Sequence, residues 1–218
     1  MKTRIIGSTV LFVLLFNLTG CSIPFFRFMG TSTSDQDEIR IDPGSVLPGT
    51  KVTRKGKDID LLGNPIAVGQ KLSSKALVDA MTMQDVDLAK EQGSVLFLSL
   101  VPSIDTKVCE AQTHYLAEEG NRITPYMRRI TISRDTPFAQ KRFAEAAKLT
   151  NIQYLSDYKE GAFGRSLGLL MDGPRLLART VIVVDKQGVV RYIQVVPEIT
   201  NLPDMEKAFD KALEIAQE

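Results

Sequence analysis

Residues 95–109 read VLFLSLVPSIDTKVC, and this stretch decides the fold. Its first seven residues, 95–101, form a continuous apolar run of strand length, which is typical of a strand buried on both faces of a sheet. A helical pattern follows from about residue 107 to residue 119. The chain is therefore predicted to pass from a central strand directly into a helix, with Cys109 in the first turn of that helix.

The next segments continue the alternation of strands and helices. Strands are predicted at residues 130–132 and 180–184, with a helix at residues 137–148 between them. Residues 185–188 then read Asp-Lys-Gln-Gly, a turn that leads into a further apolar strand at residues 189–195. Two strands separated by four residues that end in glycine predict a β-hairpin.

The last segment is predicted to be an amphipathic helix that packs on the core. It opens after Pro203 with early acidic residues. Its apolar positions recur at helical spacing: Met205, Ala208, Phe209, Ala212, Leu213 and Ala216. The whole order of elements is that of an α/β domain with a thioredoxin-like fold, in which a central mixed sheet is flanked by helices.

Composition excludes several classes of function. Among the 218 residues, 27 basic side chains nearly balance 26 acidic ones, so the chain lacks the basic footprint of a nucleic-acid binder. It has one histidine, His114, and two cysteines, Cys21 and Cys109. That is too few for a Cys/His zinc site or for a framework of structural disulfides.

The first residues are predicted to be a secretory signal. Lys2 and Arg4 give a positive start, and residues 10–16 form an apolar middle. The following Leu-Thr-Gly-Cys, residues 18–21, resembles the bacterial lipobox, which implies that residues 1–20 are a lipoprotein signal peptide and that Cys21 is lipidated. Ser22 in place of aspartate favours the outer membrane, with the protein facing the periplasm.

An uncleaved membrane anchor is the alternative to a lipoprotein. No charge occurs in residues 5–26, which are enough to cross a bilayer as a helix. Either form tethers the chain to a membrane. Residues 21–50 are polar and rich in turn residues beyond a short apolar patch, so they are predicted to be a flexible tether, and the domain is placed at residues 51–218.

Cys109 is the candidate nucleophile. At the start of a helix, unpaired backbone N–H groups and the positive end of the dipole favour a thiolate over a thiol. A lone cysteine is also common as an inert packing residue, which is the alternative for Cys109. His114 is five positions further along the same helix and does not share its face, which disfavours a Cys–His hydrolase.

The segment around Cys109 resembles a known active site. Pro102, Thr106 and Cys109 match the Pro-x-x-x-Thr-x-x-Cys motif of the peroxiredoxins, and residues 102–109 as a whole are similar to the bacterial thiol peroxidase subfamily. The resemblance extends from about Val52 to the C-terminus. Further matching motifs follow in order at residues 135–143, 172–174, 177–179 and 196–200.

The resemblance implies a role for each of four residues. Cys109 would attack the O–O bond of a peroxide and become a sulfenic acid. Thr106 would place its hydroxyl against the sulfur and the peroxide, and Arg179 would stabilise the thiolate and hold the peroxide oxygens. Pro102 would shield the pocket from water. The alternatives are a helix cap for Thr106 and a surface ion pair for Arg179. The chemistry requires no metal and no organic cofactor.

One position departs from the thiol peroxidase pattern. Ala144 stands where that subfamily has its resolving cysteine, and lipidation would block Cys21. The chain is therefore predicted to reduce hydrogen peroxide and organic hydroperoxides by a 1-Cys cycle, in which an external thiol, from a thioredoxin-like protein or a small molecule, attacks the Cys109 sulfenic acid. An intermolecular Cys109–Cys109 disulfide is the alternative within this cycle. Relatives of this kind imply a homodimer.

Two other functions stay open on the same fold. The loss of the resolving cysteine would suit a membrane-tethered redox sensor or partner-binding module with little turnover. A thiol–disulfide oxidoreductase is disfavoured, because Thr106 occupies the position of the first cysteine in a Cys-x-x-Cys motif.

Overall fold

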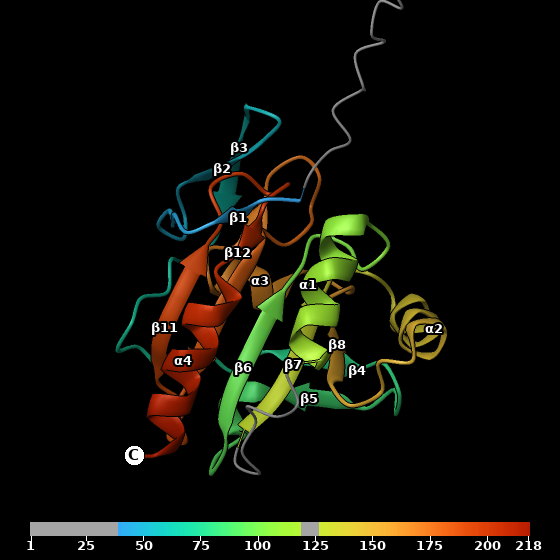
Figure 1. Ribbon diagram of the computed structural model, residues 1–218, viewed down its shortest axis with the longest axis vertical. Helices are drawn as coiled ribbons and strands as arrows, with labels where there is room; N and C mark the ends of the chain where they lie inside the picture. The colour runs from blue at the N-terminus through green and yellow to red at the C-terminus, as the bar shows by residue number, and fades with distance from the viewer. Residues whose placement is uncertain (1–38, 119–126) are drawn as a thin grey trace, which may run out of the picture. The chain divides into compact units, whose positions relative to one another are not determined.

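The apolar run at residues 95–101 forms an interior strand of a seven-stranded mixed sheet, with Val101 just beyond its end. The computed structural model describes residues 39–118 and 127–218, and Figure 1 shows the sheet with helices packed against it. In spatial order its strands are β11 (Val190–Val195), β10 (Thr180–Val184), β6 (Val95–Leu100), β7 (Met127–Ser133), β8 (Gln153–Ser156), β4 (Ala76–Asp79) and β5 (Asp85–Asp87).

The sheet combines parallel and antiparallel pairs. β7 pairs in parallel with both β6 and β8, whereas the remaining neighbours are antiparallel. The predicted hairpin is present, since β10 and β11 are antiparallel and the N–H of Gly188 donates to the carbonyl of Asp185 at 3.0 Å. These features confirm the prediction of an α/β domain with a central mixed sheet.

Helices cover the sheet and are close to the predicted ranges. They are α1 (Lys107–Glu118), α2 (Pro137–Ala147), α3 (Ala162–Ser166) and α4 (Met205–Ala216), together with a single 3-10 turn, η1 (Leu88–Lys90). Local chemistry sets the starts of two of them. Thr136 caps α2 by accepting the N–H of Ala139, and Asp204 caps α4 by accepting the N–H of Lys207.

Both faces of β6 are buried, which explains why its sequence is apolar without alternation. Val95 and Phe97 point to a core that they share with α1, α2 and α4, and the Phe97 ring stacks on Phe209 of α4 with centroids 4.5 Å apart. Leu96 and its neighbours on the other face belong to a second core, which includes Phe163 of α3. The site therefore stands on a rigid, doubly covered strand.

Two small sheets complete the fold near one end of β6. One contains β2 (Lys51–Arg54), β3 (Lys57–Leu62) and β9 (Leu170–Met171), and the other pairs β1 (Ile41–Asp42) with β12 (Leu202–Pro203). The sequence analysis predicted neither sheet, nor β4, β5, β8 and α3. These elements have two to six residues each, too few for a clear apolar period.

The flexible tether predicted for residues 21–50 differs from the structure over its described part. β1 pairs in parallel with β12, and the N–H of Val46 donates to the carbonyl of Val195 at 3.0 Å. The buried Gln194 also donates to the carbonyls of Asp42 and Gly44, at 2.7 and 2.9 Å. The compact unit therefore begins before residue 51, because backbone hydrogen bonds attach this polar segment to the sheet edge.

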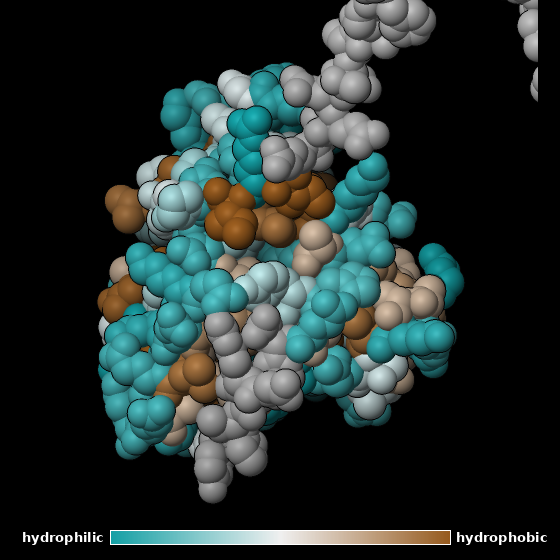
Figure 2. Space-filling model, in the orientation of Figure 1, coloured by the Kyte–Doolittle hydropathy of each residue, from teal (hydrophilic) through white to brown (hydrophobic). Residues whose placement is uncertain are grey.

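This N-terminal segment also brings apolar side chains to the surface. Figure 2 shows hydrophobic groups gathered on the face that β1 crosses in Figure 1. The exposed large apolar side chains of the segment are Ile39, Ile41 and Leu47, with Ile41 61% and Leu47 74% exposed.

Within the described ranges, no helix has both the length and the apolar character to cross a membrane. The predicted signal peptide, the alternative anchor at residues 5–26 and the lipidation site Cys21 lie outside these ranges.

Candidate active site

The connection from β6 to α1 positions Cys109. Because α1 begins at Lys107, Cys109 is in its first turn, as predicted. Its side chain is fully buried beside Val101 and Ile104, with Phe143 of α2 packed against this small cluster. The sulfur is thus held where the free N–H groups of the helix start favour an anion.

Asp135 holds this connection in place. One carboxylate oxygen accepts the hydroxyl of Ser103 and the other accepts the N–H of Ile104, both at 2.8 Å. Asp135 follows the end of β7, the parallel neighbour of β6. The sequence analysis included Asp135 in a matching motif without a role. Its position could have been inferred from the sequence, because neighbouring parallel strands end at the same edge of a sheet and Asp135 follows the strand next to β6.

Arg179 is brought directly to the sulfur. It lies just before β10, is only 2% exposed, and its Nη2 donates to Cys109 Sγ at 3.3 Å. Its other two nitrogens are also used, because Nε donates to the carbonyl of Ile199 at 2.8 Å and Nη1 donates to Gln112 Oε1 at 2.7 Å. No carboxylate pairs with this guanidinium among the described residues, so a surface ion pair is wrong for Arg179.

The burial of Arg179 has a consequence for Cys109. A cation taken out of water is costly unless an anion compensates it, and the Cys109 sulfur is the group in contact that can become one. The Cys109 sulfur therefore lies in hydrogen-bond contact with a buried cation at the start of α1.

Gln112 extends the site, and the sequence analysis missed it. Its side chain is fully buried on α1, where Oε1 accepts from Arg179 and Nε2 donates to Ser99 Oγ of β6 at 2.8 Å. Gln112 therefore fixes the guanidinium relative to both α1 and β6. The signal in the sequence was its spacing, since residues three apart on a helix share a face, here with Cys109.

Thr106 and Pro102 both lie at the pocket beside Cys109. The carbonyl of Thr106 accepts the N–H of Glu110 at 2.8 Å, so Thr106 occupies the helix-cap position that the sequence allowed. Its hydroxyl donates to the carbonyl of Ser103 at 3.3 Å. Within the described residues it makes no hydrogen bond to the sulfur, and its contact with a bound peroxide stays a prediction.

A pocket of about 240 Å³ opens beside Cys109. It is bounded by the start of α1, the β2–β3 hairpin, the segment from β9 to Arg179, and the segment after β11. Its lining residues outside the four predicted ones are mostly apolar or small: Arg54, Ile59, Ser103, Lys107, Val108, Met171, Pro174, Leu176, Ile199 and Thr200. Cys109 and Arg179 are among the lining residues, so this largely apolar pocket is the candidate site for a small hydroperoxide.

The remaining residues singled out from the sequence are not in this pocket. His114 points to the acidic residues of its own helix, with Nδ1 2.8 Å from Glu118 Oε1, so it is not a partner of Cys109. Ala144, in the place of a resolving cysteine, is fully buried in the core beneath α2. Among residues 39–118 and 127–218, no three His, Cys, Asp or Glu side chains are grouped as metal ligands.

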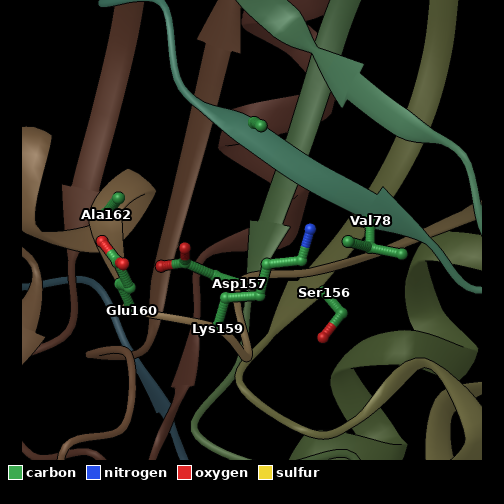
Figure 3. A pocket seen from close by; sticks show the side chains of 7 residues that line it. Val78, Ser156, Asp157, Lys159, Glu160 and Ala162 are labelled. Carbon is green, nitrogen blue, oxygen red and sulfur yellow. The ribbon is translucent and has the colours of Figure 1, made fainter.

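A second pocket, of about 180 Å³, lies between β4, the end of β8 and the start of α3 (Figure 3). Asp157 is 4% exposed there, and its two oxygens accept the N–H groups of Phe163 and Gly164 at 3.1 and 2.9 Å. Burial raises the pKa of Asp157, against the opposing effect of these hydrogen bonds and of nearby Arg134. The carboxyl group attaches α3 to the sheet, which is a structural role.

Comparisons with known proteins agree with this geometry. Residues 67–213 match the redoxin family. The chain is 40% identical to the thiol peroxidase of Halalkalibacterium halodurans over 161 residues, 74% of this chain and 96% of that protein. It is 36% identical to the thiol peroxidase of Bacillus subtilis over 162 residues, again 74% of this chain and 96% of that protein.

The fold has a counterpart among solved structures. A peroxiredoxin-like protein from Aquifex aeolicus superposes with a TM-score of 0.71 at 31% identity, covering 76% of this chain and 97% of that one. The chain therefore belongs to the redoxin family, as a thiol peroxidase of the peroxiredoxin type with a thioredoxin-like fold.

Proposed function

We propose that this peroxidase reduces hydrogen peroxide and organic hydroperoxides by a 1-Cys cycle at Cys109. The contact between Arg179 Nη2 and Cys109 Sγ, at 3.3 Å in a buried setting, is the observation that carries the proposal. The guanidinium stabilises the thiolate before the reaction and the oxygen atoms that become negative during it. Thr106 and Pro102 line the approach to the sulfur.

The first step transfers one oxygen atom. The Cys109 thiolate attacks the nearer peroxide oxygen, the O–O bond breaks, and the leaving alkoxide or hydroxide takes up a proton to give an alcohol or water. Sulfur is oxidised by two electrons to the sulfenic acid, and the peroxide is reduced by the same two electrons. No metal or organic cofactor takes part in this step.

The second half of the cycle requires a thiol from outside the chain. Cys109 and Cys21 are the two cysteines of the sequence, and Ala144 occupies the resolving position. A thiol of a thioredoxin-like protein or a small molecule attacks the sulfenic acid and releases water. A second thiol then breaks the mixed disulfide and restores Cys109.

The alternative is a sensor that reacts once, and the full burial of Cys109 is the observation that favours it. A buried sulfenic acid is poorly accessible to a bulky reductant. Steady-state peroxide consumption with dithiothreitol and with a thioredoxin system separates the two. We expect many turnovers per Cys109, with at least one of the reductants. A single equivalent consumed, followed by a stop with both, would contradict the enzymatic cycle and favour the sensor.

We also propose that the chain is an exported lipoprotein, anchored through Cys21 to the outer membrane and facing the periplasm. Support comes from the charged start, the apolar stretch and the lipobox-like residues 18–21. Metabolic labelling with palmitate is expected to mark the full-length chain and to fail for Cys21→Ser. Equal labelling of both would contradict lipidation. A homodimer stays a prediction, for which the molar mass in solution is the test.

A further inference from the structure

The mouth of the active-site pocket is positively charged. Arg54 of β2 and Lys107 of α1 line it on opposite elements, in addition to Arg179 beside the sulfur. No aspartate or glutamate is among the described residues that line the pocket. A pocket built only for hydrogen peroxide has no need of two further cations.

Arg54 and Lys107 are exposed and, within the part of the chain that the structure describes, form no ion pair and no side-chain hydrogen bond. Other exposed lysines do find partners: Lys51 of the same hairpin pairs with Asp58, and Lys159, which lines the second pocket, pairs with Asp85 at 3.3 Å. By contrast, Arg179 has all its nitrogens occupied. The two outer cations are the ones available to a ligand.

None of the acidic residues that neighbour the lining in sequence lines the pocket itself. Glu198 accepts from Thr53 and Gly56 through one oxygen and from Thr200 through the other, so both oxygens face the hairpin and the segment after β11. Asp58 pairs with Lys51, and Glu110 Oε1 lies 3.9 Å from His114 Nε2, on the side of Glu110 away from Lys107 along the helix. The other exposed acidic neighbours of the lining, which also do not line the pocket, are Asp60, Asp105 and Asp172.

Apart from the cations and the sulfur, most of the pocket lining is apolar. Ile59, Met171 and Leu176 line it from the small sheet and its connection, and Val108 and Ile199 line it from α1 and the segment after β11. A ligand that matches the pocket has three parts in order: a hydroperoxide at Cys109, an apolar body, and an anionic group at the mouth.

We propose that this pocket selects organic hydroperoxides that carry a carboxylate, with Arg54 and Lys107 as the specificity-determining residues. A carboxylate at the mouth forms charge-assisted hydrogen bonds with both cations, while the apolar body displaces water from the lining. Fatty-acid hydroperoxides are the lipid-derived members of this class. The inference rests on the proposed function, since it requires Cys109 to react with peroxides.

The test compares two substrates of equal shape and different charge. Cumene hydroperoxide bearing a para-carboxylate is compared with the same compound bearing a para-carboxamide, by stopped-flow measurement of Cys109 oxidation. We expect the second-order rate constant for the carboxylate to be about threefold to tenfold larger than that for the carboxamide. This ratio corresponds to the interaction free energy of exposed or partly exposed ion pairs. Raising the ionic strength is expected to shrink this ratio.

Variants assign the effect to the two cations. In the double variant Arg54→Gln, Lys107→Gln the ratio is expected to fall to about one. Lys57→Gln, a charge removed from β3 outside the pocket lining, is the matched control and is expected to keep the wild-type ratio. Linoleic acid hydroperoxide against its methyl ester repeats the comparison for a lipid, and the same preference is expected there.

Two results would overturn the whole inference, and a third would overturn its extension to fatty-acid hydroperoxides. Equal rates for the two cumene compounds in the wild type would do so, as would a preference that survives in the double variant. A preference that is seen with the aryl acid but is absent with the fatty acid would remove the lipid-derived members from the class. Hydrogen peroxide is included as a neutral substrate: if it also fails to oxidise Cys109, the proposed function itself is wrong.

Discussion

At the residue scale, the site consists of a sulfur and a guanidinium held together by neutral partners. Arg179 is buried, contacts the Cys109 sulfur at 3.3 Å and has no carboxylate partner among the described residues. In the proposed mechanism, the Cys109 thiolate is the anion that compensates this cation. The proposal therefore makes the reactivity of Cys109 depend on Arg179 as well as on the start of the helix.

Arg179→Lys is expected to slow the oxidation of Cys109 by hydrogen peroxide on the order of 100-fold or more. A lysine keeps the charge but cannot donate to Cys109, Gln112 and Ile199 at once. Stopped-flow oxidation measures the rate. Arg191→Lys, at the sheet edge where Arg191 pairs with Glu218 at 2.8 Å, is the matched control and should retain the wild-type rate. A rate for Arg179→Lys equal to that of the control would contradict this role.

Gln112 is expected to act as a positioning residue for Arg179. In Gln112→Ala, Arg179 Nη1 and Ser99 Oγ lose their partner, which costs about 1–3 kcal/mol of stability and slows Cys109 oxidation. Gln140→Ala removes an equally buried glutamine that bonds Ser133 and Leu155. It should lose stability without the same loss of rate. If both variants oxidise at the same rate in a folded state, Gln112 is merely structural.

The four predicted site residues could be named from the sequence because they belong to contiguous motifs. Cys109 and Arg179 are brought together as predicted, and Thr106 and Pro102 line the same pocket. Gln112 was not found, because its spacing from Cys109 indicates a shared helix face but does not show that this face is buried. The packing of α1 on β6 shows that its amide is fully buried and bonded to Ser99 and Arg179.

At the element scale, long apolar segments were predictable and short ones were not. β6, β10, α2 and α4 follow the predicted ranges within about two residues, because each carries a complete apolar pattern. β8 and β9 have four and two residues, and their strand geometry comes from the neighbours they pair with. The pocket walls built from such elements could not be predicted for the same reason.

Asp157 gives α3 a dependence on pH. Burial raises the pKa of its carboxyl group in the folded chain, so the folded state holds the proton more tightly than the unfolded state. Its contribution to stability therefore declines as pH rises from the unfolded pKa, about 4, through the raised folded value. Asp157→Asn cannot ionise and lacks this decline.

Urea unfolding of the wild type and Asp157→Asn between pH 4 and pH 7 tests that dependence. Asparagine has one acceptor oxygen for the N–H groups of Phe163 and Gly164, so the variant is expected to be less stable at low pH. The difference should narrow as pH rises. A difference that is constant, or that widens with pH, would contradict the direction of the shift.

At the scale of the whole molecule, the domain includes part of the predicted tether. Residues 41–46 attach to β12 and β11 by backbone hydrogen bonds, and the polar composition of residues 31–50 hid this pairing. Composition identifies segments that cannot form a hydrophobic core. It does not reveal a strand that pairs at the edge of a sheet, because such pairing needs few apolar side chains.

A chain that begins at residue 51 is expected to be less stable than one that begins at residue 37. It loses the β1–β12 pair and leaves Gln194 without the acceptors Asp42 and Gly44. A loss of about 1–3 kcal/mol corresponds to a few degrees in Tm for a domain of this size. Thermal unfolding of the two chains measures it, and equal Tm values would show that residues 37–50 do not stabilise the domain.

The central claim is that Cys109 meets the peroxide and forms a sulfenic acid that no second cysteine resolves. The direct measurement is the intact mass of the domain, residues 37–218, after one equivalent of hydrogen peroxide in the presence of a sulfenic-acid trap. We predict a single adduct that maps to Cys109 and is absent from Cys109→Ser. A folded domain with an unmodified Cys109 thiol would contradict the account and leave Cys109 as a packing residue.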